Sequence, residues 1–205
     1  MTEFKTFCVE FKMPAQKSKG KDGMSNWMSQ LPPELHTVPL FELALPGSHD
    51  SMSYDLDINS SIIEPDGLKR LSKIYCVRKI VRKWAITQEA TITKQLDAGV
   101  RYLDLRIARK PNDTNPTRLY FYHGLYTRTV LKDINDWAGT HPKEIVILSL
   151  SNFKGFDKKI EKQLHTHLLD FIKTLFGAKL APGKYFLHFL KNQVLCYFFL
   201  NNKAS

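Results

Sequence analysis

The sequence predicts an α/β fold with a mainly parallel sheet. Short apolar segments alternate with amphipathic segments, in the order strand, helix, strand, strand, helix, strand, helix. This alternation is typical of parallel strands joined by helices that cover the sheet. Polar residues directly follow several apolar segments, as in (β/α) barrels, whose sites lie at the carboxyl ends of the strands. Because a full barrel takes about 250 residues and four good strands are visible, either a smaller open sheet or half of a barrel fits.

Composition describes a basic, globular chain of 205 residues, with 43% hydrophobic and 24% charged residues. The net charge of +10 favours an anionic partner such as nucleic acid, a phospholipid surface or a phosphorylated substrate. No nucleic-acid-binding motif accompanies the charge, so we expect no nucleic-acid partner. Three widely spaced cysteines argue against a disulfide framework, and the polar N-terminus lacks a secretory signal. Both observations favour a reducing, cytoplasmic location.

The first third of the chain is expected to hold a mobile arm, a short helix and a strand. Residues 1–24 are polar with poor periodicity, which is typical of a flexible arm. Residues 26–35 favour a short helix stopped by Pro32-Pro33. The apolar residues 40–45 predict a strand that runs into the turn PGSHDS, and residues 51–67 have the composition of a loop.

The middle of the chain predicts basic helices and an alternating strand. Residues 68–84 mix apolar with Lys and Arg side chains, which indicates one or two basic amphipathic helices. Their basic side faces either anionic lipid or simply solvent. Residues 92–100 favour a helix, and residues 101–108 alternate as a strand. One face of this strand carries the polar side chains of Tyr102, Asp104 and Arg106.

The last part of the chain continues the alternation. Residues 119–124 predict a strand ending in a turn, residues 130–141 a helix, and residues 144–152 an almost wholly apolar strand. Residues 157–177 predict a long amphipathic helix. Residues 185–200 are apolar but carry a Lys-Asn-Gln triplet at their centre, so they predict no membrane span. A terminal helix, a strand and an interfacial segment all fit this stretch.

Three strand ends carry groups that can do chemistry: His49-Asp50, the pair Asp104 and Arg106, and His123. If the strands are parallel neighbours, these groups converge. One imidazole can then remove a proton from a hydroxyl while the other protonates a leaving oxygen. A guanidinium can hold a phosphate and neutralise its growing charge. The simpler alternatives are structural histidines and an ion pair between Arg106 and Asp104.

Four motifs resemble the phosphatidylinositol-specific phospholipase C X domain: LPGSHDSMSY, QLDAGVRYLDLRIA, LYFYHGLY and HPKEIVILSLSNF. The resemblance covers residues 25–180 and is nearest to the small eukaryotic group that contains only the X domain, which KWAITQ at 83–88 also resembles. It implies an α/β, TIM-barrel-like phosphodiesterase fold, of which this sequence holds about the first half. It divides the chain into a flexible arm (1–24), an X-like domain (25–182) and a divergent tail (183–205).

The resemblance also implies roles for five site residues. His49 would be the general base for the inositol 2-hydroxyl, whose attack on phosphorus gives a cyclic inositol phosphate. His123 would be the general acid for the departing diacylglycerol oxygen. Arg106 would hold the phosphate, with Asp50 orienting or polarising the acid histidine or the arginine. Asp104 would be a supporting acid beside them.

The resemblance implies no metal and no other cofactor. Calcium-dependent relatives place acids where this sequence has Arg106 and Ser151, and a cation at that position would repel calcium. The expected partner is phosphatidylinositol in membranes, which the protein reaches by peripheral contact. The alternative function follows from the divergent tail: a catalytically impaired, truncated isoform that binds phosphoinositides or a membrane surface.

Overall fold

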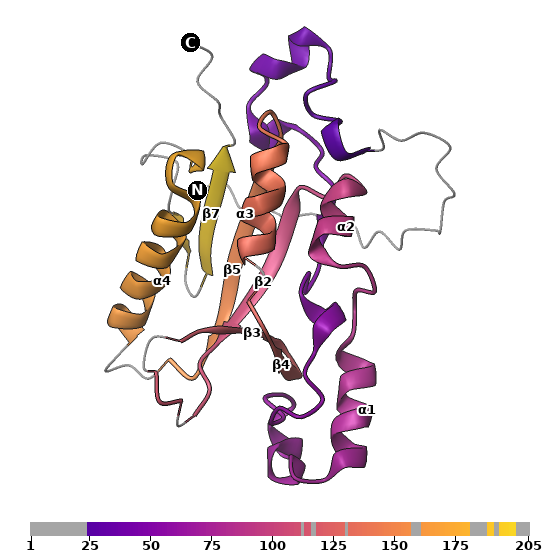
Figure 1. Ribbon diagram of the computed structural model, residues 1–205, viewed down its shortest axis with the longest axis vertical. Coiled ribbons are helices and arrows are strands. Elements are labelled where there is room, and N and C mark those ends of the chain that lie inside the picture. Colours follow the sequence, from indigo (N-terminus) through magenta and orange to yellow (C-terminus); the bar gives the residue numbers. More distant parts are fainter. Residues whose placement is uncertain are drawn as a thin grey trace.

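A computed structural model describes residues 24–111, 113–115, 118–129, 131–156, 161–180, 188–190 and 193–199. Within these ranges the chain forms a mixed sheet flanked by helices (Figure 1). Neighbouring strands follow the order β4-β3-β2-β5-β7-β6, and β1 pairs with β2 outside this path. The predicted arm lies outside the described residues apart from Met24. The division of the chain at residue 182 stays a prediction.

The described sheet has seven strands, and its parallel part is small. Their bounds are β1 Gly47–Ser48, β2 Tyr102–Ala108, β3 Tyr120–His123, β4 Leu125–Thr127, β5 Ile145–Lys154, β6 His188–Leu190 and β7 Gln193–Phe199. Only the pairs β1–β2 and β2–β5 are parallel. The prediction of a mainly parallel sheet is therefore wrong for the described residues. The other four pairs are antiparallel, and in two of them, β3–β4 and β6–β7, the connection is too short to join parallel strands.

The first predicted strand is also displaced. Residues 40–45 begin with a 3-10 turn at Leu40–Glu42, and pairing starts only at β1, inside the segment expected to be a turn. Pro46 lacks a backbone N–H, so it cannot donate to a sheet ladder. Its carbonyl instead accepts from the N–H groups of Arg101 and Tyr102 at 2.8 and 3.1 Å. The predicted helix at 26–35 is likewise replaced by two 3-10 turns, Met24–Asn26 and Pro33–Thr37.

The remaining helices lie where the periodicity places them. They are α1 Tyr75–Ala85, α2 Ile92–Asp97, α3 Leu131–Thr140 and α4 Glu161–Phe176, with 3-10 turns at Ser53–Asp55, Asp66–Leu71 and Gly177–Lys179. The basic segment 68–84 thus gives a 3-10 turn followed by α1. Among the described residues no helix has the length and hydropathy that a membrane crossing requires.

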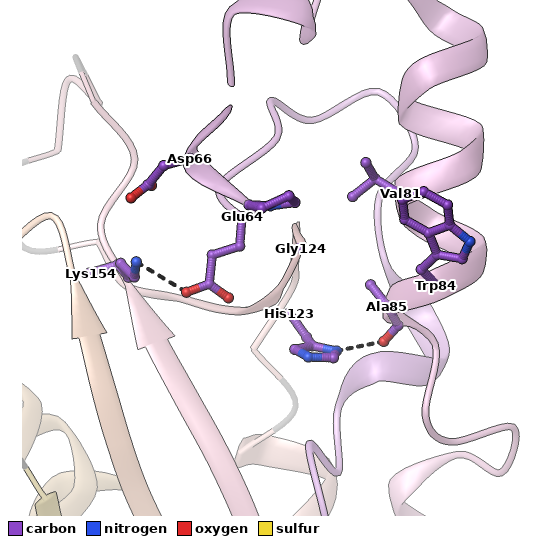
Figure 2. A pocket seen from close by; sticks show the side chains of 9 residues that line it. Glu64, Asp66, Val81, Trp84, Ala85, His123, Gly124 and Lys154 are labelled. Carbon is purple, nitrogen blue, oxygen red and sulfur yellow. Dashed lines mark hydrogen bonds and ion pairs between the residues drawn. The ribbon is translucent and has the colours of Figure 1, made fainter. Parts of the chain in front are cut away.

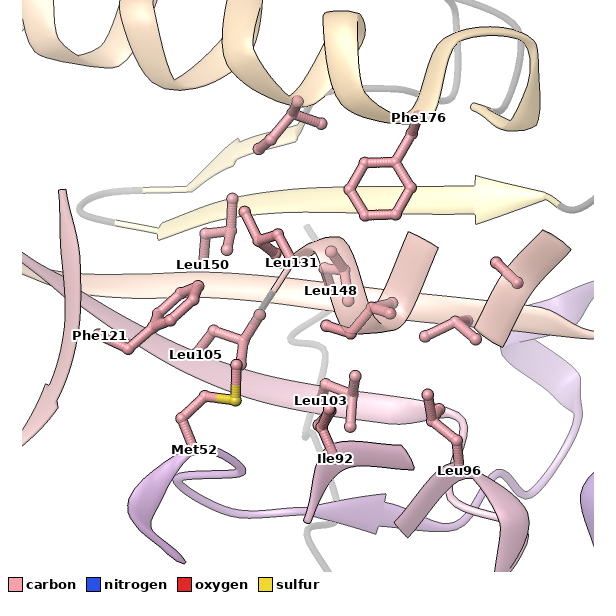
Figure 3. Close-up of a cluster of buried hydrophobic side chains, with 14 of the residues drawn as sticks. Met52, Ile92, Leu96, Leu103, Leu105, Phe121, Leu131, Leu148, Leu150 and Phe176 are labelled. Carbon is pink, nitrogen blue, oxygen red and sulfur yellow. The ribbon is translucent and has the colours of Figure 1, made fainter. Parts of the chain in front are cut away.

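The core lies between the central strands and the helices, as Figure 3 shows. The alternation predicted for β2 is present, because Leu103 and Leu105 are fully buried while Asp104 and Arg106 are half-buried on the other face. Helices α2, α3 and α4 supply apolar side chains to the same cluster. The period-2 pattern therefore directs leucines into the core and charged groups to the face that carries the site. Other buried members of this cluster include Ile92, Leu96, Leu131, Leu148, Leu150, Ile172 and Phe176.

A buried ion pair ties the N-terminal segment to the sheet. Arg101 and Glu144 have no exposed side-chain surface, and Arg101 Nη2 lies 2.7 Å from Glu144 Oε2. Arg101 also donates to the carbonyl of Ser25 at 2.6 Å. Glu144 accepts from the backbone N–H groups of Met28 and Ser29 at 3.2 and 3.0 Å. This network fixes the start of β2, the start of β5 and residues 24–29 against one another.

Candidate active site

The structure brings all five residues of the predicted site together. His49 and Asp50 follow β1 directly, Asp104 and Arg106 lie on β2, and His123 ends β3. The expected convergence of three parallel strand ends is wrong for β3, which runs antiparallel to β2. His123 nevertheless reaches the others, since its Nε2 lies 3.3 Å from Asp50 Oδ2.

The carboxylate of Asp50 is the centre of the site. Its Oδ1 lies 2.6 Å from Arg106 Nε, and its Oδ2 lies 3.0 Å from His49 Nε2 and 3.3 Å from His123 Nε2. Only 1% of the Asp50 side chain is exposed. Burial raises the pKa of Asp50, while the positive charges of His123, Arg106 and His49 oppose this rise. Arg106 thus forms an ion pair with Asp50 rather than with Asp104.

Strand β2 fixes the backbone around Asp50. Asp50 has a φ of 45°, a left-handed conformation that non-glycine residues adopt only when their surroundings hold them. Its N–H donates to Asp104 Oδ2 at 3.3 Å. The N–H of Ser51 donates to the Asp104 carbonyl at 2.9 Å, and Ser51 Oγ accepts from the Asp104 N–H at 3.0 Å. The site loop is therefore anchored on one residue of β2.

His49 contacts carboxylates through both ring nitrogens. Its Nδ1 lies 2.8 Å from Asp104 Oδ2, while Nε2 contacts the central carboxylate. Gln88 Nε2 and Thr87 Oγ1 donate to the carbonyl of His49 at 2.9 and 3.2 Å. Ser151 Oγ donates to the other Asp104 oxygen at 3.4 Å. The hydrogen bonds from Thr87 and Gln88 hold the backbone of His49. The His49 side chain is half exposed, so the ring remains accessible to a ligand.

His123 is held more firmly than His49. Its Nδ1 lies 2.6 Å from the carbonyl of Ala85 at the end of α1, as Figure 2 shows. Since a carbonyl only accepts, Nδ1 carries a proton in this arrangement and Nε2 faces Asp50. Gly124 follows with a φ of +68°, and a Cβ there would lie 2.9 Å from the Ala85 Cβ. Glycine thus permits the close approach of His123 to α1.

The donor set does not fit calcium. Ligand atoms of His49, Asp50 and Asp104 lie within 4.8 Å of one another, the one such group among the described residues. Calcium takes six to eight oxygen ligands, whereas this group offers two carboxylates and an imidazole. Arg106 Nε, 2.6 Å from Asp50 Oδ1, adds a positive charge at the same place. Metal-independent chemistry stays a prediction.

Some contacts of the site escaped sequence reasoning. The segment 83–88 resembles the family in sequence, but its contacts with the two histidines could not be predicted from it. Ala85 holds His123, and Thr87 and Gln88 hold His49. All three contacts use a backbone carbonyl as the acceptor, and residue type does not show which carbonyls will do so. The only available signal was the motif itself.

Comparison with known proteins identifies the family. The model of the family described as "Phosphatidylinositol-specific phospholipase C, X domain" matches residues 72–193. The chain belongs to this family. The human PI-PLC X domain-containing protein 2 is 42% identical over 165 residues, which are 78% of this chain and 52% of that protein. The human PI-PLC X domain-containing protein 3 is 37% identical over 178 residues, or 83% of this chain and 54% of that protein.

This X-domain chain therefore spans about half the length of the curated relatives it matches. Solved structures agree on the fold. The phosphatidylinositol-specific phospholipase C from Listeria monocytogenes gives a TM-score of 0.52 at 21% identity, covering 86% of this chain and 64% of that one. A Staphylococcus aureus phosphatidylinositol-specific phospholipase C gives 0.51 at 21% identity, covering 84% and 49%. The predicted α/β, TIM-barrel-like fold with an incomplete barrel is confirmed.

Proposed function

We propose that this X-domain chain cleaves phosphatidylinositol at the glycerol–phosphate bond, by two-histidine acid–base catalysis without a metal. The observation that carries the proposal is the sharing of one buried carboxylate, Asp50, by His49, His123 and Arg106. Membership of the phospholipase C X-domain family supports a phospholipase C-like hydrolase. Two proton-transfer groups and one phosphate-binding cation are the minimum set for an intramolecular phosphoryl transfer.

The first step assigns the base to His49. Asp104 beside Nδ1 favours the tautomer that carries its proton on that nitrogen, which leaves Nε2 as the base. Nε2 takes the proton of the inositol 2-hydroxyl while the oxygen of that group forms a bond to phosphorus. In the described arrangement Nε2 contacts Asp50, so the substrate hydroxyl replaces the carboxylate as its partner.

The second step assigns the acid to His123. Its Nδ1 proton is committed to the Ala85 carbonyl, so only the imidazolium form has a proton to give from Nε2. The bond from phosphorus to the glycerol oxygen breaks, and that oxygen receives the Nε2 proton. Diacylglycerol leaves, and a cyclic inositol phosphate remains. The nearby Asp50 carboxylate stabilises the imidazolium before the transfer.

Arg106 is the phosphate-binding group of the proposal. Its Nε pairs with Asp50, and only 19% of its side chain is exposed. Within the described residues its two terminal amino groups form no ion pair or hydrogen bond. Their N–H groups can therefore bind the non-bridging phosphate oxygens and neutralise the charge that grows on them.

Peripheral contact with an anionic membrane is part of the proposal, from the cytoplasmic side. Helix α1 exposes large apolar side chains that include Tyr75 and Trp84, with Lys79 and Lys83 on the same helix. Aromatic side chains insert at the boundary between lipid headgroups and acyl chains, and lysines attract anionic headgroups. Because the Ala85 carbonyl at the end of α1 holds His123, contact through α1 would bring the lipid surface beside the site.

Hydrolysis of phosphatidylinositol by the purified 205-residue chain tests the proposal. Vesicles are incubated with protein in excess chelator, and released inositol phosphate is measured for the wild type, His49→Ala and His123→Ala. We expect both variants to lose at least about 10³-fold in rate. His36→Ala, which changes an exposed histidine outside the site, is the matched control.

Two outcomes contradict the proposal. Release that persists in both histidine variants would rule out the two-histidine mechanism. A folded wild type that binds vesicles without turnover would favour the alternative, a phosphoinositide-binding or membrane-binding form. Circular dichroism of every variant shows that loss of activity is not loss of fold.

A further inference from the structure

The segment that leads into α1 is basic and lies at the surface. Lys69 and Arg70 come three and two residues ahead of Ser72. Residues 65–76 include no buried residue, and this part of the chain lies at the lower edge of the molecule in Figure 1. Lys69 pairs with Asp66 at 2.7 Å, whereas Arg70 is exposed and forms no ion pair among the described residues. The charge of Arg70 is therefore available to a partner that approaches Ser72.

The hydroxyl of Ser72 joins this segment to the loop behind it. Its Oγ donates to the carbonyl of Lys69 at 2.6 Å and accepts from the N–H of Ile62 at 3.0 Å. The carbonyl of Ser72 accepts from Arg78 Nη1, and Arg78 Nε donates to the carbonyl of Ile58 at 2.8 Å. A phosphoryl group on Oγ would remove the proton that Lys69 accepts and would place negative charge beside the guanidinium of Arg78.

Ser72 adjoins the face of α1 that carries the proposed membrane contact. Tyr75, Lys79 and Lys83 follow one another at intervals of four residues, so they share one face of the helix, and all three are exposed. The attraction of such a face to anionic lipid grows with the number of its positive charges. A phosphoserine carries about −1.5 to −2 charges at pH 7. A phosphate on Ser72 would therefore offset about two lysines at the start of this face.

We propose that Ser72 is a regulatory phosphorylation site for a protein kinase that recognises basic residues ahead of its target serine. Lys69 and Arg70 supply this charge pattern. In the modification, Ser72 Oγ forms a bond to the γ-phosphorus of ATP, the bond from that phosphorus to the ADP oxygen breaks, and the hydroxyl proton passes to the kinase. The phosphate weakens the contact of α1 with an anionic membrane, and this consequence rests on the proposed function.

Labelling of the purified chain tests the site. The protein is incubated with ATP and the catalytic subunit of cyclic-AMP-dependent protein kinase, and mass spectrometry locates the phosphate in the wild type, Ser72→Ala, Arg70→Ala and Ser61→Ala. Ser61 is an exposed serine with no Lys or Arg among residues 50–60, so its variant is the matched control. We expect stoichiometric labelling of Ser72 in the wild type and in Ser61→Ala, and labelling at least about 10-fold slower in Arg70→Ala. An unlabelled Ser72, or a rate that Arg70→Ala leaves unchanged, would overturn the site.

Vesicle binding of the labelled chain tests the consequence of the modification. Sedimentation with vesicles that contain phosphatidylserine measures the affinity of the wild type before phosphorylation, after it, and after removal of the phosphate by a phosphatase. We expect phosphorylation to weaken binding at least about 10-fold and the phosphatase to restore it. Ser72→Ala treated with the kinase is the control and should keep its affinity. An affinity that phosphorylation leaves unchanged, or an equal loss in the treated Ser72→Ala variant, would overturn the regulatory role.

The two experiments distinguish failure of this inference from failure of the proposed function. If the unmodified chain binds no vesicles, the proposed membrane contact fails and labelling alone decides the site. Labelling of Ser72 that depends on Arg70 then supports the site, and absent labelling overturns it. If the unmodified chain binds vesicles and full phosphorylation leaves that binding unchanged, the membrane contact stands and the inference fails.

Discussion

Nδ1 of His49 lies 2.8 Å from Oδ2 of Asp104, a residue of the neighbouring strand β2. Asp104 in turn accepts from the N–H of Asp50 and from Ser151 Oγ. The half-exposed imidazole therefore has a carboxylate partner that is itself held in place. In acid–base sites a carboxylate in this position fixes the tautomer of its histidine.

Replacing Asp104 by Asn should lower kcat by about 10² to 10⁴-fold, because an amide no longer favours the Nδ1–H tautomer of His49. Ser151→Ala, which removes a 3.4 Å contact to the same carboxylate, should have a much smaller effect. A full pH profile of kcat tests both variants. If Asp104→Asn keeps the wild-type rate and pH profile, then Asp104 has a structural role only.

The acid role of His123 predicts a dependence on the leaving group. A substrate whose leaving group is a nitrophenol needs little protonation, so His123→Ala should lose far less activity on it than on phosphatidylinositol. His49→Ala should lose activity on both, because the 2-hydroxyl still needs a base. Initial rates of the two variants on the two substrates measure this difference. Equal losses for His123→Ala on both would show that it does not protonate the leaving oxygen.

Catalysis should be independent of divalent cations. The guanidinium of Arg106 beside Asp50 supplies the positive charge, and the donor set is poor in oxygen ligands for calcium. We expect the same rate in excess chelator and in millimolar calcium, and a loss of about 10²-fold or more in Arg106→Ala. Activity that disappears with chelator and returns with calcium would contradict this prediction.

The raised pKa of Asp50 predicts how stability changes with pH. Because burial raises this pKa above 3.8, the folded protein binds the proton more tightly than the unfolded chain. The contribution of Asp50 to stability is therefore fully present below the unfolded pKa and is lost as the pH rises through the raised, folded pKa. Relative to Asp50→Asn, the wild type should lose free energy of unfolding from about pH 3.5 upward. Urea unfolding of both proteins at stepped pH measures the difference, and a relative gain by the wild type would mean a lowered pKa.

The buried pair of Arg101 and Glu144 should dominate the anchoring of residues 24–29. Glu144→Gln leaves a guanidinium without a counter-charge at a fully buried position, which costs about 3 to 5 kcal/mol. Asp136→Asn, which breaks an exposed pair with Lys132, should leave the unfolding midpoint unchanged. Denaturant unfolding of the two variants makes the comparison. Equal stabilities for them would show that the buried network contributes little.

Much of the fold follows from periodicity in the sequence. The alternation in β2 predicts its inner and outer faces because a strand has a period of two, and the long amphipathic pattern predicts α4. The direction of β3 could not be read, since a strand pattern carries no orientation. In the structure β3 runs antiparallel to β2, and the single-residue turn at Gly124 then makes β4 antiparallel to β3. The prediction of the first strand was wrong because the apolar residues 40–45, ahead of Pro46, have the composition of a strand.

The membership of the site was predictable, but its internal pairing was not. Histidines and charged residues at strand ends mark His49, Asp50, Asp104, Arg106 and His123 without reference to geometry. Asp50 and Asp104 are both possible partners of Arg106, and residue type does not distinguish them. The structure pairs Arg106 with Asp50, whose position depends on a left-handed backbone. Such a conformation is not visible in the residue type of an aspartate.

The pairing of β7 with β5 has a consequence for the assembly of this sheet. Residues from Ile145 to Ser151 pair with β7 on one side of β5, while β2 occupies the other side. Both hydrogen-bonding edges of β5 are thus in use. A fragment of a longer relative, added in trans to complete a barrel, could reach β5 only by strand exchange. Incorporation of the fragment would therefore be limited by the rate at which β7 dissociates from β5. Above the concentration at which this step becomes rate-limiting, adding more fragment would not speed incorporation.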